Sequence, residues 1–406
     1  MSQTGQTHDI AVVGLGPSGL AAALALAHIG ADVIAVGEAP SSNHATETRT
    51  AALLASSIEL LKALGIWQAL EPHAAPLKAI RIVDASGSLI RAPDIEFAAS
   101  ELNLSAFGYN IPNTLLVEAL LERAKVVLPA VIAANVEKIS TDGKSAVLTL
   151  SQGGPLQALL VTGADGRASI CRKSAGIGVT ERHYDQAAIS TSFRHSRPHE
   201  GVSTEFHREG GSVTTVPLTD PHASSLIWVG TRGEVAGLMR HNAEAFAEAL
   251  SLRLDGILGA ISDIGPRAEF PVSGLVANGL AARRTVLVGE AAHILPPIGA
   301  QGLNLGFRDA AFLADCVAEA LRAGRDPGGE DVLEAYRRGR SLDVMTRFLG
   351  VDLLSRSLLT SLPPLQAVRG IVMHGLKAFS PLRRAAMRVG LAPPTELPTL
   401  MRPGAA

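Results

Sequence analysis

Apolar residues near the start of the chain fall into a strand, a helix and a second strand. The short apolar runs 9–13 and 32–37 have the length of buried strands, and the apolar stretch 20–29 between them has the length of a helix. Gly30 stands at the position of a helix C-terminal cap. This order predicts a βαβ unit at the N-terminal end.

Polar and apolar residues alternate over much of the middle of the chain. Residues 77–97 alternate around Ser86–Gly87, and Asp142–Gly143 separates two further apolar runs, so both stretches predict hairpins. A helix is predicted between them at 114–124, with Asn113 near its N-cap. Four more alternating runs predict one antiparallel sheet with one buried face, and they lie at 187–193, 202–207, 212–216 and 225–229.

A strand, a turn rich in glycine and proline, and a helix follow one another over residues 285–311. The β-branched run 285–288 predicts a buried strand, and two prolines with Gly299 prevent helix or sheet pairing in the turn. A helical pattern begins near Gly302. Such a turn places a helix N-terminus and free backbone N–H groups against an anion or a polarised ring. The alternative is an ordinary core bend in which Gly and Pro serve only the turn.

The last part of the chain predicts helices and carries positive charge. Helical patterns cover 311–323 and 331–348, and from Leu353 onward the sequence has seven Lys or Arg residues and one acid, Glu396. Apolar residues alternate with these cations at helical spacing. Two interpretations stay open: an amphipathic segment that lies on an anionic membrane surface, or a helical cap packed on the core with its cations in water.

Composition limits the classes of protein to which the chain can belong. Its 406 residues suit two domains, or one with large insertions, and 47% hydrophobic against 18% charged residues exclude a disordered chain. The formal net charge of −2 argues against a nucleic-acid partner. Cys171 and Cys316 provide neither a disulfide framework nor a metal-ligand cluster, which fits a reducing cytoplasm and no bound metal. No segment is long and apolar enough to span a bilayer, and no Lys or Arg precedes Arg49, so a signal peptide is not expected.

The sequence GLGPSG, at 14–19, lies between the first predicted strand and the first predicted helix. In such a motif Gly14 permits a tight turn, Gly16 lets the backbone approach a pyrophosphate, and Gly19 lets helix and strand pack closely. Pro17 suits the first turn of the helix. Glu38 ends the second strand, where an acid accepts hydrogen bonds from an adenosine ribose and repels a 2′-phosphate. FAD or NAD is therefore favoured over NADP at this motif.

Other polar positions are less specific by themselves. Arg49 precedes a helical pattern over 52–64, and it is either a contact to the pyrophosphate or a solvated arginine at a helix start. Asp165–Gly166, within GADGRAS, follows the apolar run 159–162 and alone indicates an ordinary turn. The histidines between 183 and 222 lack metal-ligand spacing and are interpreted mostly as surface residues; they are His183, His195, His199, His207 and His222.

Three motifs stand in order along the chain: GLGPSG, then GADGRAS with Arg172, then LVGEAAHILPPIGAQGLNLG. The combination resembles the single-component flavoprotein aromatic hydroxylases, most closely their ubiquinone-biosynthesis branch, over nearly the whole chain. The resemblance implies an α/β fold with a doubly wound, Rossmann-like FAD-binding domain, an inserted antiparallel β-sheet that roofs the substrate pocket, and a C-terminal helical segment. The implied boundaries are 1–75, 105–182 and 273–345 for the FAD-binding domain, 76–104 and 183–272 for the sheet domain, and 346–406 for the helical segment.

The resemblance also implies the residues that hold the cofactor. The glycines of the first motif and Asp165–Gly166 would lie at the pyrophosphate, Glu38 at the adenosine ribose, and Glu290 at the ribityl chain. The full set of implied cofactor-binding residues is Gly14, Gly16, Pro17, Ser18, Gly19, Glu38, Arg49, Asn113, Val136, Asp165, Gly166, Glu290, Pro297, Gly299, Gln301, Gly302, Leu303 and Asn304. The last six of these would line the flavin ring.

The third motif departs from the usual pattern of the family. Glu290 stands where the family usually has Asp. Pro296–Pro297 and Gly299–Ala300 stand where the ubiquinone branch often has His-Pro and Ala-Gly. The arrangement in this chain also occurs among hydroxylases of soluble aromatic compounds, so both substrate classes stay open.

The resemblance implies an FAD-dependent monooxygenase, in which NAD(P)H reduces the FAD and one atom of O₂ goes to an electron-rich aromatic carbon. Aromatic residues make up only 4% of the chain, which predicts an aliphatic pocket and favours a polyprenylated phenol or quinol of ubiquinone biosynthesis as substrate. Pro297, Gly299 and Gln301 are the flavin-facing candidates, but the sequence identifies no catalytic base. The alternatives are a hydroxylase of a small soluble aromatic compound and a flavin-binding redox or assembly protein without turnover. The expected location is the cytoplasm, peripheral contact with the inner membrane stays open, and no oligomeric state is predicted.

Overall fold

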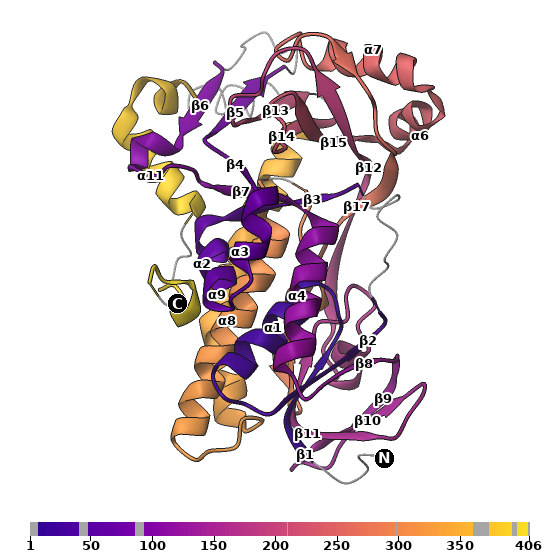
Figure 1. The fold of residues 1–406 in the computed structure, drawn as a ribbon, viewed down its shortest axis with the longest axis vertical. Coiled ribbons are helices and arrows are strands. Elements are labelled where there is room, and N and C mark those ends of the chain that lie inside the picture. The colour runs from indigo at the N-terminus through magenta and orange to yellow at the C-terminus, as the bar shows by residue number, and fades with distance from the viewer. Residues whose placement is uncertain are drawn as a thin grey trace.

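The computed structural model describes residues 7–39, 48–85, 93–208, 210–297, 299–359, 373–391 and 396–404. Two large sheets lie at opposite ends of an elongated molecule, with long helices beside and between them (Figure 1). The predicted turn at Ser86–Gly87 and residues 360–372 of the basic tail fall outside the described residues.

The first sheet, which we call the body sheet, is built on parallel strands that are apolar on both faces. Its order is β18-β19-β11-β1-β2-β8, and β9 and β10 extend it beyond β11. The strands are β1 (Thr7–Val13), β2 (Val33–Gly37), β8 (Ala130–Ala133), β9 (Val136–Thr141), β10 (Ala146–Leu150), β11 (Leu156–Gly163), β18 (Ala281–Ala282) and β19 (Thr285–Leu287). The β11–β19, β1–β11, β1–β2 and β2–β8 pairs are parallel. The chain order reverses between β1 and β11, which confirms the doubly wound fold and marks where such sheets bind ligands.

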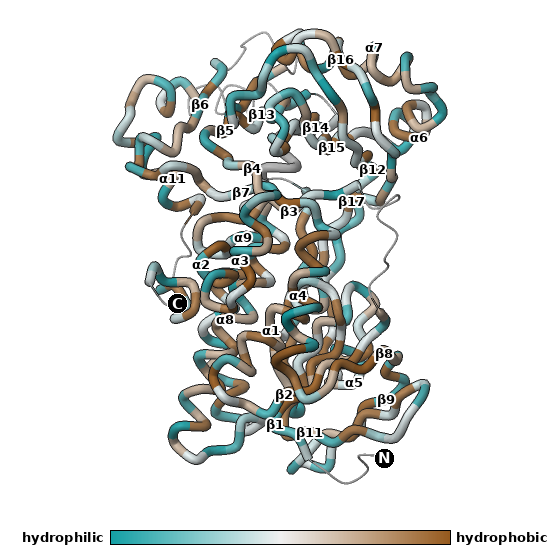
Figure 2. Tube along the Cα trace, in the orientation of Figure 1, coloured by the Kyte–Doolittle hydropathy of each residue, from teal (hydrophilic) through white to brown (hydrophobic). Residues whose placement is uncertain are grey.

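Helices cover the body sheet. They are α1 (Pro17–His28), α4 (Asn113–Val127), α5 (Ile170–Ser174), α8 (Gln301–Arg322) and α9 (Glu330–Leu359). Residues 19–26 of α1 are all buried, because this helix is apolar on every side and lies between the sheet and other helices (Figure 2).

A small sheet of order β3-β7-β4 stands between the body and the second large sheet. It consists of β3 (Thr50–Leu54), β4 (Ala75–Pro76) and β7 (Gly108–Pro112), and the short helices α2 (Ala55–Ala63) and α3 (Trp67–Leu70) follow β3. The helix predicted from residue 52 therefore begins three residues later, because pairing with β7 draws residues 52–54 into a strand. Arg49 consequently precedes a strand and not a helix.

The second large sheet, which we call the roof, has the order β20-β17-β12-β15-β14-β13-β5-β6, with β16 beside β12. Its strands are β5 (Ala79–Asp84), β6 (Ile95–Ala98), β12 (Val179–His195), β13 (Val202–Arg208), β14 (Gly211–Pro217), β15 (Ala223–Thr231), β16 (Ile261–Ser262), β17 (Ala268–Ala277) and β20 (His293–Ile294). The four predicted alternating runs do form antiparallel neighbours, whereas β5 pairs with β13 in parallel. We propose the same domain division as above, with the long strands β12 and β17 running across its boundaries.

The two faces of the roof differ in what covers them. The helices α6 (Arg232–Arg240) and α7 (Ala243–Arg253) pack on one face, where Phe193, Phe206, Leu226 and Trp228 form a core with Phe246 and Leu250. The opposite face carries serines and threonines that bond to the small sheet. The side chain of Asn110 on β7, for example, donates to the carbonyl oxygen of Pro217 at 2.9 Å.

The C-terminal helix α11 (Ser380–Leu391) lies against the edge of the roof. Met387 is buried there beside Phe97 and Phe107, and Arg383 forms a bidentate ion pair with Glu101. This face of α11 is a cap on the core, one of the two interpretations of the basic end. In the described residues no helix combines the length and the apolarity that crossing a membrane requires.

Candidate functional site

The first two motifs touch each other at the ends of β1 and β11. A Cβ on Gly14 would lie 2.2 Å from the carbonyl oxygen of Ala164, and Gly14 has a φ of +116°, which residues with side chains rarely adopt. An added Cβ on Gly19 would lie 2.1 Å from the carbonyl oxygen of Gly14. Glycine is therefore required at both positions, for a tight turn at Gly14 and for close helix packing at Gly19.

Ser18 brings the third motif to the first. Its Oγ occupies the space where a Cβ on Gly289 or on Gly306 would stand, at 2.8 Å and 2.5 Å. Gly289 lies two residues after the end of β19, and Gly306 lies in the second turn of α8. Three turns that are far apart in the sequence thus converge at one end of the body sheet.

The converging turns leave open space where a dinucleotide would lie. A Cβ on Gly16, Gly166 or Gly302 would meet no heavy atom within 4 Å, so the backbone at each position is open on one side. The helices α1 and α8 begin at these turns without a side-chain cap and without an acid in the first turn. Their first backbone N–H groups can therefore bind phosphate or carbonyl oxygens of a ligand. These residues fit an elongated dinucleotide such as FAD.

The two predicted acids stand at the ends of body strands. Glu38 directly follows β2 and is exposed, and Glu290 is exposed in the short turn after β19. The carboxyl ends of parallel strands are where open α/β sheets bind ligands, so both positions suit a cofactor that runs along this edge.

The remaining predicted contacts lie around the same edge. The carbonyl oxygen of Arg49, an exposed residue, accepts a bond from the backbone N–H of Asn113 at 3.1 Å. Asn113 is the first residue of α4, after its N-cap Pro112. Val136 is half-buried at the start of β9, two residues after Ala134, whose N–H bonds to the carbonyl oxygen of Gly37. The structure thus brings Val136 and Glu38 to the same end of β2.

The side chain of Asp165 is engaged within its own turn. Its Oδ1 accepts a bond from Ser169 Oγ at 2.6 Å, and its Oδ2 accepts one from the backbone N–H of Cys171 at 3.0 Å. Arg172 is buried and donates to the carbonyl oxygens of Ala291 and Arg167. The predicted Asp165–Gly166 turn is therefore held by its acid, and the open backbone of Gly166 is the part that a cofactor can approach.

The turn before α8 contains the flavin-facing candidates. Gly299 and Ala300 both have positive φ values, +63° and +53°, and Pro297 is half-buried. Gln301 is the first residue of α8; its Nε2 donates to the carbonyl oxygen of Gly299, and its Oε1 accepts from Arg347 Nη1 at 2.7 Å. This turn is thus fixed by side chains of its own and of α9.

Hydrogen bonds of the Asn304 side chain attach the turn before α8 to the small sheet and to α2. Its Oδ1 accepts bonds from Leu54 N–H and Ser57 Oγ, at 2.8 and 2.7 Å. Its Nδ2 donates to the carbonyl oxygens of Ala52 and Ala300, at 2.9 and 2.6 Å. The side chain predicted to line the flavin is therefore fully used inside the protein. Because α8 begins at Gln301 after its N-cap Ala300, the backbone N–H groups that the helix leaves unbonded are those before Asn304, such as Gly302 and Leu303.

A buried ionic network supports this turn, and the sequence interpretation missed it. We call it the platform network: His293, Arg308, Asp309, Arg340, Asp343 and Arg347. Asp309 accepts bonds from Gly289 N–H at 3.1 Å, from His293 Nε2 at 2.6 Å and from Arg340 Nε at 2.8 Å. Asp309 and Arg340 are each 1% exposed.

The second acid of the network is Asp343. It receives Arg308 Nη1 at 2.6 Å, Arg340 Nη1 at 2.7 Å and Arg347 Nε at 3.3 Å. Since Arg347 also holds Gln301, the network connects the backbone beside Glu290 with the turn before α8. Charged residues on the otherwise apolar face of α8, and at i, i+3 and i+7 on α9, were the available sequence signal.

Charge interactions set the protonation of the platform network. Burial alone would raise the pKa of Asp309, but the positive charges of His293 and Arg340 outweigh it and hold that pKa below the ordinary value of 3.8. Burial opposes ionisation of Asp343 as well, and Arg340 and Arg308 likewise bring its pKa below 3.8. Both acids are therefore carboxylates at neutral pH.

The prediction that the histidines of the roof lie mostly on the surface is wrong. His195 and His207 are buried, at 4% and 6% exposure, His199 and His222 are half-buried, and only His183 is exposed. The reason is register, because each buried imidazole falls on a covered face of the sheet. His207 Nε2 lies 2.8 Å from Oε1 of Glu205, which is buried as well.

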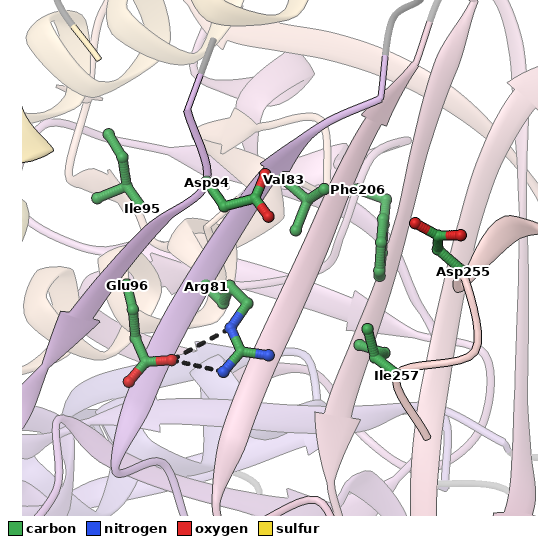
Figure 3. Close-up of a pocket in the computed structure, with 8 residues that line it drawn as sticks. All are labelled: Arg81, Val83, Asp94, Ile95, Glu96, Phe206, Asp255 and Ile257. Carbon is green, nitrogen blue, oxygen red and sulfur yellow. Dashed lines mark hydrogen bonds and ion pairs between the residues drawn. The ribbon is translucent and has the colours of Figure 1, made fainter. Parts of the chain in front are cut away.

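One described cavity lies on the far side of the roof. It has a volume of about 290 Å³ and is lined by Arg81, Val83, Asp94, Ile95, Glu96, Phe206, Asp255 and Ile257 (Figure 3). Arg81 and Glu96 are joined by an ion pair within it. Because Phe206 and Val83 belong to the core with α7, this cavity opens on the face turned away from the converging turns.

Comparison with known proteins agrees with this geometry. The FAD binding domain family matches residues 7–347. Ubiquinone hydroxylase UbiL of Rhodospirillum rubrum is 34% identical over 97% of this chain and 92% of its own length. The 3-demethoxyubiquinol 3-hydroxylase of Escherichia coli is 29% identical over 96% of this chain and 99% of its own length. The crystal structure of p-nitrophenol 4-monooxygenase PnpA from Pseudomonas putida, at 19% identity, covers 96% of this chain and 99% of its own with a TM-score of 0.77, which shows a shared fold.

Proposed function

Because this chain belongs to the family of FAD-dependent aromatic hydroxylases, near the ubiquinone-biosynthesis branch, we propose that it hydroxylates the ring of a polyprenylated phenol or quinol. The co-substrates in this proposal are O₂ and NAD(P)H. One observation carries most of the weight: the three motif turns meet at positions where only glycine fits, in a chain 34% identical to a ubiquinone hydroxylase over nearly its whole length.

We assign the cofactor contacts from the open backbone positions. The N-terminus of α1 and the backbone at Gly16 and Gly166 would bind the pyrophosphate, Glu38 the ribose, and Glu290 the ribityl chain. The first N–H groups of α8 would face the flavin, where a helix N-terminus stabilises negative charge. When bound and reduced by NAD(P)H, FAD supplies the activation of O₂. The protein contributes binding, orientation and exclusion of water.

The C-terminal helix supports a lipid-soluble substrate. Phe379, directly before α11, and Leu382 and Val389 on it are 67%, 50% and 76% exposed. Arg384 and Arg388 are exposed on the same helix. Apolar side chains next to cations suit the surface of an anionic membrane, where a polyprenylated ring compound would be found.

Product formation tests the proposal directly. The purified protein, reconstituted with FAD, is incubated with NADH or NADPH, O₂ and a short-chain polyprenyl phenol, and the products are analysed by mass spectrometry. A product heavier by one oxygen atom is expected, together with substrate-stimulated oxidation of the nicotinamide. Bound, reducible FAD without any hydroxylated product would contradict the proposed substrate class, and no stimulated oxidation would favour a flavin-binding protein without turnover.

A pair of glycine variants tests the cofactor site. Gly16→Ala adds a methyl group in open space, so the chain should fold normally while its affinity for FAD falls. Gly14→Ala places the methyl group 2.2 Å from a backbone oxygen, so folding itself should suffer. Flavin content and thermal unfolding of both variants separate the two effects, and unchanged FAD affinity in Gly16→Ala would remove the pyrophosphate from this turn.

Hydroxylation of a small soluble aromatic compound is the second candidate. The Pro296–Pro297 and Gly299–Ala300 arrangement favours it, since soluble hydroxylases share that pattern. Flotation with vesicles that contain anionic phospholipid separates the two candidates. Binding that is lost in Phe379→Ser with Leu382→Ser favours the polyprenylated substrate, whereas a protein that stays in the unbound fraction favours the soluble one.

A further inference from the structure

The roof carries a buried pair of an acid and a base that the cofactor site does not use. Glu205 and His207 are two residues apart on β13, so their side chains point to the same face of the sheet. The two are 8% and 6% exposed, and the 2.8 Å contact joins Glu205 Oε1 to His207 Nε2.

Strand register shows which face this is. Residues that lie directly opposite each other on neighbouring strands share a face. One such rank runs across β13, β14, β15 and β12 through Glu205, Thr214, Ile227 and Ser190. Ser190 Oγ lies 2.6 Å from Oγ1 of Thr48, directly before β3. The face with Glu205 and His207 is therefore the one that meets the small sheet.

The small sheet connects this face to the turn before α8. Thr50 of β3 bonds to Ser225 of the roof at 3.0 Å, and the other end of β3, at Leu54, bonds to Asn304 in the first turn of α8. The roof face that bears Glu205 and His207 thus lies over the segment that joins it to the proposed flavin turn. The opposite face is closed by α6 and α7, and Phe206, between the pair in sequence, packs there.

Resting on the proposed function, we propose that His207, oriented by Glu205, is the base that accepts the proton of the ring hydroxyl of the substrate. With Glu205 as a carboxylate, His207 Nε2–H donates to it, and Nδ1 presents a lone pair. The O–H bond of the phenol breaks and an N–H bond forms at Nδ1. The electron pair stays on the oxygen and is delocalised into the ring, which makes the neighbouring carbons electron-rich.

The surroundings suit this proton transfer. On the same face the neighbouring strands contribute Asp84 of β5, opposite His207, and the uncharged Ser212 of β14. Beside His207 on this face, the described residues of β5, β13 and β14 include two acids and no cation. His207 is the catalytic residue in this assignment, and Glu205 is its positioning residue.

The test compares pH profiles of hydroxylation in FAD-loaded wild-type protein and His207→Gln. At pH 7 the variant should hydroxylate about 1000-fold more slowly, which lies within the usual contribution of a general base and matches the small ionised fraction of a phenol with a pKa of about 10. Its rate should then rise about tenfold per pH unit toward pH 10, where a phenol ionises without help. The wild-type rate should change little over this range. A substrate with fluorine on the ring, and thus a more acidic hydroxyl, should reduce the loss in the variant.

Two further variants keep the test decisive. Glu205→Gln should lower the rate at pH 7 and show the same rise with pH, even if His207→Gln fails to fold. His195→Gln, which removes a buried histidine from the other face of the roof, should keep the wild-type profile. Parallel profiles for wild type and both pair variants would overturn the assignment. Wild-type protein that makes no hydroxylated product would instead refute the proposed function.

Discussion

The molecule contains two buried carboxylate–histidine pairs whose surroundings differ. In the body, Asp309 holds His293 at 2.6 Å and also accepts bonds from Arg340 and the backbone of Gly289. In the roof, Glu205 holds His207 at 2.8 Å, and no charged side chain other than His207 bonds to it in the described part of the chain.

The number of partners separates a structural pair from a reactive one. A buried carboxylate with several charge-assisted bonds has little freedom to change its protonation or its position, so it is a rigid support. His293 also keeps an unbonded Nδ1, so the difference between the pairs lies in the carboxylates: Asp309 accepts bonds from His293, Arg340 and Gly289 N–H, and Glu205 accepts one from His207. The body pair therefore supports the turn before α8, and the roof pair is suited to proton transfer from a substrate.

The largest expected difference in unfolding free energy comes from removing the carboxylate charge of the body pair rather than that of the roof pair. Asp309→Asn removes one of the two carboxylates that pair with the buried Arg340. Breaking a buried ion pair costs about 3–5 kcal/mol of unfolding free energy. Glu205→Gln keeps size and hydrogen bonding, and should cost about 1 kcal/mol or less. Urea unfolding of both variants measures the difference. Equal losses would show that the two pairs serve the same structural purpose.

Loss of the Asn304 hydrogen bonds should have the second-largest effect on the unfolding free energy. Asn304→Ala removes four buried hydrogen bonds and leaves their partners without replacements, which should cost about 2–4 kcal/mol. Flavin should also dissociate more easily, because the turn before α8 loses its attachment to β3. Urea unfolding and fluorescence of released flavin measure both effects. The matched control is Gln301→Ala, at the half-buried start of the same helix. If Gln301→Ala lost as much unfolding free energy as Asn304→Ala, the special contribution of the Asn304 hydrogen bonds would be contradicted.

Acid should weaken the body pair by a smaller amount. The pKa of Asp309 is below 3.8 in the folded protein, so its contribution to stability is present above that value and is lost as the pH falls through the lowered pKa. Each unit of lowering is worth about 1.4 kcal/mol. Unfolding free energies from pH 5 to pH 2.5 should fall less steeply in Asp309→Asn than in wild type. A slope in Asp309→Asn as steep as that of wild type would contradict this assignment.

The smallest expected effect is on the alkylation of the two cysteine thiols, whose rate measures how accessible the interior of the body is to solvent. Burial raises the pKa of Cys316 on α8 to about 12, and burial raises that of Cys171 well above its ordinary value. At pH 8 the fraction of thiolate at Cys316 should be about 1000-fold below that of an ordinary cysteine. Alkylation by iodoacetamide, followed by mass spectrometry, should therefore label neither residue in the folded protein. Rapid labelling of Cys316 would show that the body opens at α8.

Local sequence was sufficient for the body sheet and its turns. The GLGPSG motif predicts the β1–α1 turn because Gly14 and Gly19 are restricted by atoms close to them in the fold, and glycine is the residue that satisfies such contacts. The hairpin at Asp142–Gly143 and the alternating runs of the roof followed from turn chemistry and period-two patterns. Residues 52–54 were misjudged, since their apolar pattern fits a helix and a strand equally well until β7 is beside them.

The proposed catalytic pair and the platform network could not be predicted from local sequence. Glu205 and His207 look like any polar residues of an alternating strand, and only the register of the roof turns them toward the body. Arg340 and Asp309 are 31 residues apart, and neither has a local reason to be buried.

The sequence alone determined the doubly wound fold, the dinucleotide turns and the class of flavoprotein, because these depend on backbone conformations that few residue types allow. Only the tertiary structure decided which charged and titratable side chains are buried together and what they face. Burial and pairing of such groups arise from contacts between distant segments, and no local pattern records which segments will meet.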